Sequence, residues 1–523
     1  MKLLLDAARG LAGRKKVLTA IALFLASAIA VPAQTLTTLH NFDGADGRYP
    51  VGPLVLYKGN FYGTTYEGGN SSNSGTVFKI TPSGTLTTLY DFCSQTECTD
   101  GSAPSPLLTL GTDGNFYGTT GSGGAHSGGT FFRITPAGTL AVVYSFCSTM
   151  GCTDGQYPSQ PIQATNGNFY GTTIFGGANG RGTVFEITPA GALTTLYNFC
   201  SLSGCGDGSG AVSGVIQGKD GNLYGTAETG GTTNADCPSG CGTVFEMTPS
   251  GTLTTLHSFD YTDGAQLESG LVQGSNGEFY GATEGGGTGG SGTVFEITSG
   301  GSLTTLQNLD YHPDGAFPIG ALIQGSNGNF YGTTDGGGNS SNGGTVFEIT
   351  PGGELATLYD FCSQSSCTDG VEPVGALVRY TNGAFIGATS HGGTSSACSG
   401  GCGTIFKLVP ASPKISADCN IANSQSGLPP YPGSCGITNE GPGEAYGVRV
   451  SSVTISAGGC TYKAPTENLT PGQSVSFPIS CTFAPVCNEA YTLQIKGNFV
   501  GGNFSGTNTF LFCTDETSVS GTN

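Results

Sequence analysis

The feature that most constrains the fold of this chain is an internal repeat. The segment Phe-Tyr-Gly-Thr-Thr at 61–65 returns along the chain, with spacings between its tyrosines from 51 residues (Tyr280 to Tyr331) to 56 residues (Tyr224 to Tyr280). The tyrosine position falls at Tyr62, Tyr117, Tyr170, Tyr224, Tyr280, Tyr331 and, in degenerate form, Ile386. A repeat of this period indicates one supersecondary unit that buries its apolar face only against its neighbours.

Each repeat carries four short segments rich in Thr, Val, Ile, Phe and Tyr, separated by turn residues, and we therefore expect four strands per repeat. The third segment, GTVFKI-like, follows a Gly-Gly pair, and the fourth resembles TLTTLYDF. Asp-Gly and Asn-Gly dipeptides such as Asp113-Gly114 link the first and second segments, which is the two-residue hairpin signal. Four consecutively hairpinned strands are typical of one blade of a β-propeller.

The ends of the repeat region predict a closed ring. The first copy of the fourth segment, at 35–42, precedes the first complete repeat, and the last repeat, ending near Pro410, lacks that segment. We expect the N-terminal segment to pair beside 404–409 and so to complete the last blade. The predicted fold is all-β, with a seven-bladed β-propeller at 34–410 followed by an immunoglobulin-like β-sandwich at 411–523, whose expected strands are 447–455, 474–481, 491–499 and 507–513.

Residues 1–33 have the pattern of a secretory signal peptide, because Arg14, Lys15 and Lys16 precede an apolar run at 17–31 that ends in small residues. Of the 17 basic and 36 acidic residues, this segment holds five and one, so the mature chain keeps 12 and 35 and carries a net charge of −23. Such a charge disfavours nucleic acid and anionic lipid as partners. We expect a secreted, extracellular or cell-surface protein that does not insert into a membrane after signal cleavage.

The 18 cysteines of an exported chain predict disulfide bonds rather than metal sites. Six local pairs are expected, because loops that lack one cysteine of a pair also lack the other. These pairs are Cys93 with Cys98, Cys147 with Cys152, Cys200 with Cys205, Cys237 with Cys241, Cys362 with Cys367, and Cys398 with Cys402. The pairing of the six tail cysteines, Cys419, Cys435, Cys460, Cys481, Cys487 and Cys513, stays open. Hairpin connectivity puts every stapled loop on one face of the ring, which is the expected recognition surface.

An Asp-Gly dipeptide recurs in the loop before each repeat. Its acids are Asp46, Asp100, Asp154, Asp207, Asp263, Asp314 and Asp369. A ring of acids could attract calcium, the one possible cofactor that the sequence suggests, but a carboxylate that accepts its own turn's amides explains the recurrence more simply.

The position directly after the second segment breaks the symmetry of the repeats. Its occupants are Tyr66, Gly121, Ile174, Glu228, Glu284, Asp335 and Ser390, with Glu67 and His391 one residue further on in the first and last repeats. Tyr66, Glu67, Glu228, Glu284, Asp335 and His391 are therefore the candidate binding residues. The favoured function is a non-catalytic binding or adhesion scaffold for an extracellular glycan or protein. The alternative is a carbohydrate-active hydrolase or lyase that uses Glu228, Glu284 and Asp335 as acid and base.

The quoted segments, DGNFYGTT followed by Gly-Gly, GTVFEITP and GTLTTLYNF, resemble the Gloeo/Verruco ("GloVer") tandem-repeat family of bacterial exported β-propeller-like proteins. The resemblance covers residues 35–410. It implies export, often with a C-terminal surface anchor, and it supplies no catalytic residues. We recognise no such anchor at the end of this chain, so release and attachment through the tail domain both stay open.

Overall fold

The computed structural model describes residues 35–338 and 341–410, and in the tail the strands between residues 415 and 512. Strands dominate it, and its helical elements are four short 3-10 turns: η1 (Thr96–Cys98), η2 (Ser203–Cys205), η3 (Ser365–Cys367) and η4 (Thr381–Gly383). Among the described residues no helix has the length and apolar character needed to cross a membrane. The predicted signal peptide at 1–33 lies outside the described residues.

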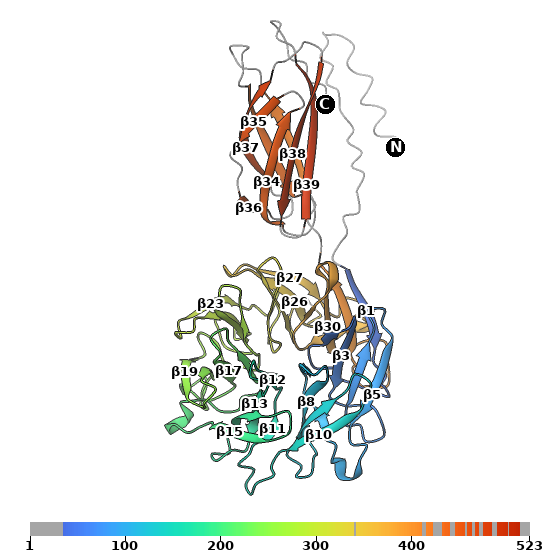
Figure 1. Cartoon of the computed structure of the whole chain (residues 1–523), viewed down its shortest axis with the longest axis vertical. Coiled ribbons are helices and arrows are strands. Elements are labelled where there is room, and N and C mark those ends of the chain that lie inside the picture. Colours follow the sequence, from blue (N-terminus) through green and yellow to red (C-terminus); the bar gives the residue numbers. More distant parts are fainter. Residues whose placement is uncertain are drawn as a thin grey trace, which may run out of the picture.

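Seven antiparallel sheets of four or five strands follow one another along residues 35–409 and surround a common centre (Figure 1). The first contains β2 (Val55–Tyr57), β3 (Asn60–Thr65), β4 (Thr76–Ile80) and β5 (Leu86–Asp91). The second contains β6 (Ser102–Pro104), β7 (Thr109–Leu110), β8 (Phe116–Ser122), β9 (Thr130–Ile134) and β10 (Leu140–Ser145). The third contains β11 (Gln156–Pro158), β12 (Ile162–Gln163), β13 (Phe169–Phe175), β14 (Thr183–Ile187) and β15 (Leu193–Asn198).

The fourth sheet contains β16 (Val215–Gln217), β17 (Leu223–Ala227), β18 (Thr243–Met247) and β19 (Leu253–Ser258). The fifth contains β20 (Val272–Gln273), β21 (Phe279–Thr283), β22 (Thr293–Ile297) and β23 (Leu303–Asn308). The sixth contains β24 (Ile323–Gln324), β25 (Phe330–Thr334), β26 (Thr345–Ile349) and β27 (Leu355–Asp360). The seventh joins β28 (Val371–Pro373), β29 (Val378–Arg379), β30 (Phe385–His391) and β31 (Thr404–Val409) to β1 (Thr35–Asn41).

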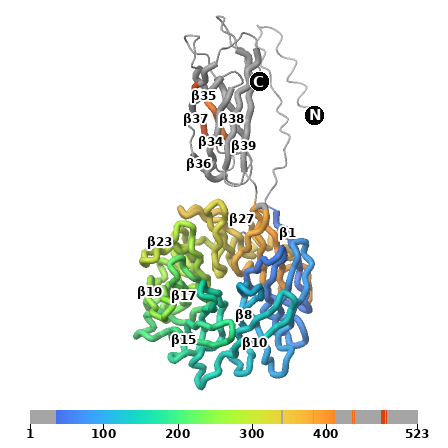
Figure 2. The backbone as a smooth tube through the Cα atoms, in the orientation of Figure 1, coloured from blue at the N-terminus to red at the C-terminus, as the bar shows by residue number. Residues whose placement is uncertain are grey.

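The seventh sheet confirms the expected use of the N-terminal segment. Strand β1 pairs antiparallel with β31, with Thr35 opposite Val409 and Asn41 opposite Thr404. In Figure 2 the blue start of the ring lies directly beside its orange end. Residues from both ends of the repeat region therefore complete one sheet.

The innermost strand differs from the prediction of one strand per repeat. In the second, third and seventh sheets it is interrupted, so that β6 and β7, β11 and β12, and β28 and β29 pair separately with the next strand. In the other four sheets the first part is a single β-bridge, such as that of Ser209 with Thr229. The interruption follows a residue with positive φ in every sheet, including the fourth and fifth, where Ala211 and Leu267 rather than proline come next. The unusual backbone conformation of this residue therefore interrupts the pairing.

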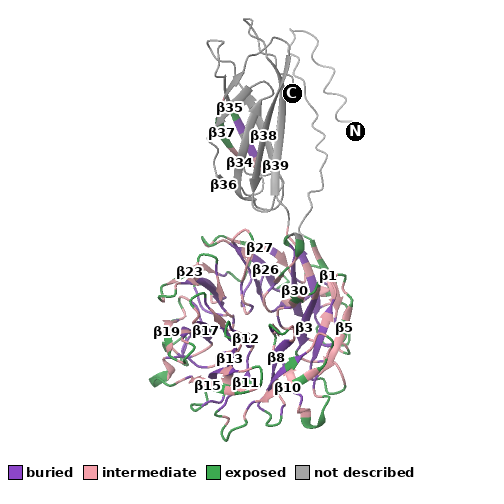
Figure 3. Ribbon diagram, in the orientation of Figure 1, coloured by how far each residue is buried: buried purple, intermediate pink, exposed green. Residues whose placement is uncertain are grey.

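Neighbouring sheets pack through the aromatic residues of the Phe-Tyr-Gly segment, as expected for residues of an inter-sheet core. The ring of Tyr280 stacks on Phe330 of the next sheet at 3.9 Å between centroids, and Tyr224 stacks on Phe279 at 4.0 Å. Ile386 of the seventh sheet shares a buried cluster with Phe61 of the first, so the last sheet contacts the first. In Figure 3 the buried residues, in purple, lie along the strands of these sheets.

The glycine of the same segment is required by close packing. A Cβ atom at Gly63 would lie 2.8 Å from Cζ of Phe78, and one at Gly332 would lie 2.5 Å from Cζ of Phe347. The phenylalanine of the third segment therefore fills the space that a side chain would need, and the repeat keeps both residues together.

The tail strands form one hydrogen-bonded antiparallel sheet of eight strands. They are β32 (Ile415–Ile421), β33 (Tyr431–Asn439), β34 (Ala445–Ile455), β35 (Gly458–Tyr462), β36 (Thr466–Leu469), β37 (Ser474–Phe483), β38 (Glu489–Phe499) and β39 (Gly502–Phe512). The four strands expected from sequence correspond to β34, β37, β38 and β39. Cys487 and Cys513 lie outside the described residues, and Cys435 is disulfide-bonded and faces Cys419 across the ladder.

Candidate functional site

The symmetry-breaking position lies beside a conformationally unusual residue in every sheet. The backbone N–H of Glu284 donates to the carbonyl of Gln266 at 2.9 Å, and that of Tyr66 donates to Tyr49 at 3.0 Å. Residues equivalent to Gln266 have positive φ in all seven sheets: Tyr49, Ala103, Tyr157, Gly210, Gln266, Phe317 and Glu372. Side chains other than glycine rarely adopt this conformation, and such residues cluster where a protein binds or reacts.

In the first three sheets, residues at these positions line a cavity of about 520 Å³ at the centre of the ring. Every one of the seven sheets contributes lining residues, among them Val51, Ala103, Ile174, Val212, Ile319 and Val374. The lining is mostly apolar, with Ser105, Ser122, Ser159, Gln160 and Ser213 as polar exceptions, and it holds a single carboxylate, that of Glu268. A concave, mainly apolar site with a few polar groups is the usual form of a ligand pocket.

Carboxylates gather along one side of the cavity. We call this group the acidic arc; it consists of Glu228, Glu268, Glu284, Asp335 and Glu372. All five are half-buried. The sequence prediction identified Glu228, Glu284 and Asp335, which the structure brings together, because each influences the ionisation of another member of the arc. The structure adds Glu268 and Glu372.

Burial and mutual repulsion raise the pKa of most of these groups. Burial and the nearby Glu284 raise the pKa of Glu268 to about 7, and the two carboxyl groups face each other closely enough to share a proton. Burial and Glu372 raise the pKa of Asp335 to about 6. The pKa of Glu228 is also raised, by burial and then by Glu268. Carboxylates that lack cationic partners cannot all ionise at low cost.

His391 is the base that the described residues place at the arc, and it is already engaged. Its Nδ1 atom lies 2.6 Å from Oε2 of Glu372, and the Ser390 hydroxyl donates to the same oxygen at 3.0 Å. The pair raises the pKa of His391 and lowers that of Glu372. Tyr49 packs against the His391 ring at 4.7 Å, which ties the seventh sheet to the first.

Aromatic side chains occupy the opposite side of the same mouth. We call Tyr66, Tyr157 and Phe175 the aromatic arc; they are 47%, 38% and 50% exposed, which is unusual for large apolar side chains. Tyr66 and Tyr157 line the cavity, and the rings of Tyr157 and Phe175 meet edge to face at 5.7 Å. Glu67, predicted as a binding residue, instead forms an ion pair with Arg48 at 2.5 Å.

The seven Asp-Gly acids are held separately, each inside its own loop. In the stapled loops the carboxylate accepts from a tyrosine and from a serine amide, as Asp100 does from Tyr90 at 2.8 Å and from Ser94 at 2.9 Å. The same pattern recurs at Asp154, Asp207 and Asp369.

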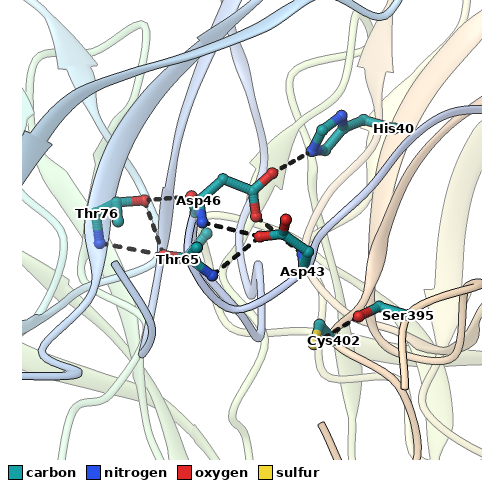
Figure 4. Close-up of polar contacts among 8 residues, drawn as sticks. His40, Asp43, Asp46, Thr65, Thr76, Ser395 and Cys402 are labelled. Atoms are coloured by element: carbon teal, nitrogen blue, oxygen red, sulfur yellow. Dashed lines mark hydrogen bonds and ion pairs between the residues drawn. The ribbon is translucent and has the colours of Figure 1, made fainter. Parts of the chain in front are cut away.

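In two of the loops without cysteines a histidine replaces the tyrosine. Asp46 binds His40 at 2.7 Å (Figure 4), and Asp263 binds His257 at the same distance. In the third such loop Asp314 accepts from Gln307 at 3.3 Å. Within the residues described, no three His, Cys, Asp or Glu side chains form a group that could hold a metal ion.

The six predicted local disulfides are all present. They join Cys93 to Cys98, Cys147 to Cys152, Cys200 to Cys205, Cys237 to Cys241, Cys362 to Cys367 and Cys398 to Cys402. Four of these disulfides close the loops in which an Asp-Gly carboxylate accepts from a tyrosine, those of Asp100, Asp154, Asp207 and Asp369. No cysteine among the described residues lines the cavity, so the disulfides stabilise loops and do not form part of the lining.

Sequence reasoning missed Glu268 and Glu372 because, in the loop before the first segment of each repeat, it compared the repeats only at the Asp-Gly dipeptide. Glu268 stands two residues after the positive-φ position, where the other sheets carry Val51, Ser105, Ser159, Val212, Ile319 and Val374. A comparison of that position among the seven repeats would have singled out its lone charge.

The chain matches one protein family among those compared. The sequence model of the family described as "Gloeobacter/Verrucomicrobia repeat" matches residues 27–153, 151–343, 231–462 and 299–509. No curated protein matches the chain.

Two solved structures are similar to parts of the chain. One is a putative oxidoreductase (glucose dehydrogenase) from Thermus thermophilus, 14% identical, covering 58% of this chain and 95% of its own, with a TM-score of 0.34. The other is a xylan β-1,4-xylosidase from Bacillus halodurans, 11% identical, covering 78% and 94%, with a TM-score of 0.31.

Proposed function

The chain belongs to the Gloeobacter/Verrucomicrobia repeat family, and we propose that it is an exported scaffold that binds a glycan at the central cavity of its stapled face. In this proposal the seven sheets are the blades of a β-propeller that β1 closes, and the tail sheet is an immunoglobulin-like domain that spaces or attaches the ring. The six disulfides suit an oxidising, extracellular setting.

One observation carries the proposal: a cavity built from all seven sheets, with exposed aromatic rings along one side. Flat aromatic faces offer apolar surface against the C–H faces of a pyranose ring. The hydroxyls of Ser105, Ser159 and Ser213 already hydrogen-bond within the scaffold, but their oxygens, like the side-chain carbonyl of Gln160, can accept a further bond from a sugar hydroxyl. The remaining lining is mainly apolar and comes mostly from the segments that precede the innermost strands.

Calorimetric titration of the purified protein against a panel of neutral and charged oligosaccharides tests this function. Tyr157→Ala should weaken binding by roughly three- to tenfold, the value expected for loss of one aromatic contact. Tyr311→Ala is the matched control, because Tyr311 is 39% exposed and does not line the cavity. Equal affinities in the two variants, or no glycan bound at all, would reject the proposal.

A second function, glycoside hydrolysis, is favoured by the raised pKa values of two carboxyls in neighbouring sheets, those of Glu268 and Asp335. Burial raises the pKa of Glu268 to about 7, so it could protonate the leaving glycosidic oxygen while an ionised carboxylate, that of Asp335, attacks the anomeric carbon or activates water. Glu284 is too close to Glu268 to act as its partner across a sugar ring. Bond cleavage then consumes one water molecule and restores both carboxyls. Product release that Glu268→Gln and Asp335→Asn each abolish would establish this activity, whereas binding without product release leaves the scaffold function.

A further inference from the structure

The two sides of the cavity differ in chemistry, and the difference bears on the class of ligand. The acidic arc brings five carboxyls together, and the cationic partner that the described residues give it, His391, is bound to Glu372. None of the cavity's lining residues is Lys or Arg. Four carboxyls, those of Glu228, Glu268, Glu284 and Asp335, thus stand beside a mainly apolar cavity with no ion-pair partner in the described part of the chain.

We propose that the glycan bound in this cavity carries free amino groups, so that an ammonium lies against the acidic arc while a sugar ring lies against the aromatic arc. The inference rests on the proposed glycan-binding function and names its substrate class: a β-1,4-linked glucosamine oligomer or a glycan of the same kind.

The charge distribution favours an ammonium over a metal ion. Calcium requires several oxygens converging on one point, and no group of three metal-ligating side chains occurs within the part of the chain that is described. An ammonium group needs only one carboxylate within hydrogen-bond distance, so the successive amino groups of an oligomer can each meet a different carboxylate along the arc. Charge-assisted hydrogen bonds of this kind are about twice as strong as neutral ones.

The opposite side of the cavity favours a sugar over a lysine side chain. Tyr66 and Tyr157 expose their rings toward the mouth, and Phe175 extends this surface beyond the lining. A lysine stem is a slender alkyl chain that would fill little of a cavity of about 520 Å³. A pyranose with one amino and several hydroxyl substituents matches the rings, the serines and the carboxylates at once.

Raised carboxyl pKa values give the inference a second readout. An ammonium beside Glu268 favours the ionised carboxylate, so binding should release a proton from a group whose pKa is about 7 in the free protein. Titration in two buffers of different ionisation enthalpy, at a pH low enough that the amino groups are already protonated, measures that proton directly. A neutral sugar would release none.

The decisive experiment compares four probes by calorimetry: a glucosamine tetramer, its fully N-acetylated form, a cello-oligomer of equal length and tetralysine. We expect the glucosamine tetramer to bind at least about tenfold more tightly than the other three, with proton release. Glu268→Gln and Asp335→Asn should each remove most of that preference and leave the affinity for the cello-oligomer unchanged. Glu97→Gln, a loop acid outside the cavity lining, is the matched control and should change neither.

The outcomes separate this inference from the proposed function. Equal binding of the three sugars keeps glycan recognition and rejects the amino specificity. Tetralysine binding as tightly as the amino sugar would reject a glycan as the source of the ammonium. No binding of any sugar rejects both. If Glu268→Gln fails to fold, which circular dichroism would reveal, Asp335→Asn and Glu228→Gln carry the same test.

Discussion

The acidic arc and the aromatic arc are built on the same backbone and differ only in side chains. In both, the residue that follows the Phe-Tyr-Gly strand donates its backbone N–H to the carbonyl of the positive-φ residue, at 2.9 Å for Glu284 and 3.0 Å for Tyr66. In both, paired threonines bridge the two central strands at 2.9 Å, as Thr283 and Thr293 do in one and Thr65 and Thr76 in the other. The repeat therefore fixes the scaffold and leaves the cavity positions free to diverge.

The positions that diverge interact with one another rather than with the repeated scaffold. Phe347 and Gly332 must change together because they share one space, whereas Glu268 interacts with Glu284, and Glu372 with His391, at other positions that differ among the repeats. Substitution there costs little packing energy. One face can thus acquire two different chemistries without loss of the fold.

The largest expected effect concerns the sheet at which the two arcs meet. Phe42 follows β1 and is fully buried, and its N–H donates to the carbonyl of Gly403. Phe199 makes the same bond to Gly182 in the third sheet, whose strands are all consecutive in the sequence. Phe42→Ala should lower the free energy of unfolding by about 3–5 kcal/mol, as for other buried phenylalanines. Phe199→Ala is the matched control in chemical denaturation. A much smaller loss for Phe42→Ala would mean that β1 contributes little to the ring.

A smaller effect concerns the pH dependence of stability, which should come from the acidic arc and not from the aromatic arc. The raised pKa values of Glu268 (about 7) and Asp335 (about 6) mean that both bind protons more tightly in the folded than in the unfolded protein. Their contribution to stability is full below their unfolded pKa values and is lost as pH rises through 6 to 7.

Unfolding free energy should therefore fall between about pH 4 and pH 7. Glu268→Gln should flatten this dependence and raise stability above pH 7 by about 1–2 kcal/mol, a value reduced for partial solvent screening. Thermal unfolding across this range measures it, with Glu97→Gln as control. A parallel pH profile for Glu268→Gln and the parent chain would contradict the assignment.

The smallest effect concerns the one sheet of the acidic arc in which the threonine pair is broken. Ala227 replaces the first threonine there, and the buried Thr243 hydroxyl has no hydrogen-bond partner. Ala227→Thr should restore the pair found in the other sheets and raise the free energy of unfolding by about 1 kcal/mol. Thr173→Ala, which removes an intact pair, should lower it by a similar amount.

If Ala227→Thr instead destabilises the protein, the space of the missing threonine in the fourth sheet is already filled by neighbouring atoms, and the prediction is wrong. Crowding would be the physical reason for that outcome, because a Cβ atom on Gly208 would meet both Ala227 and Thr243 at 2.7 Å.

The sequence by itself determined the three long strands of each repeat, their order, the pairing of β1 with β31 and the six local disulfides, although not the break in the innermost strand or four of the eight tail strands. These follow from a repeated pattern in which the same turns, threonines and aromatic residues recur, and local spacing is sufficient to read them. It also identified Glu228, Glu284 and Asp335 as a departure from the symmetry of the repeats.

Only the tertiary structure decided which of those departures meet. It joined Glu268 and Glu372 to the three predicted acids, assigned Glu67 to Arg48, and set Tyr157 and Phe175 opposite the carboxylates. The physical reason is that these contacts depend on how the strands of one sheet pair, as for Glu67 and Arg48, and on how the sheets turn around the centre, as for Asp335 and Glu372. Spacing along a single repeat contains neither kind of information.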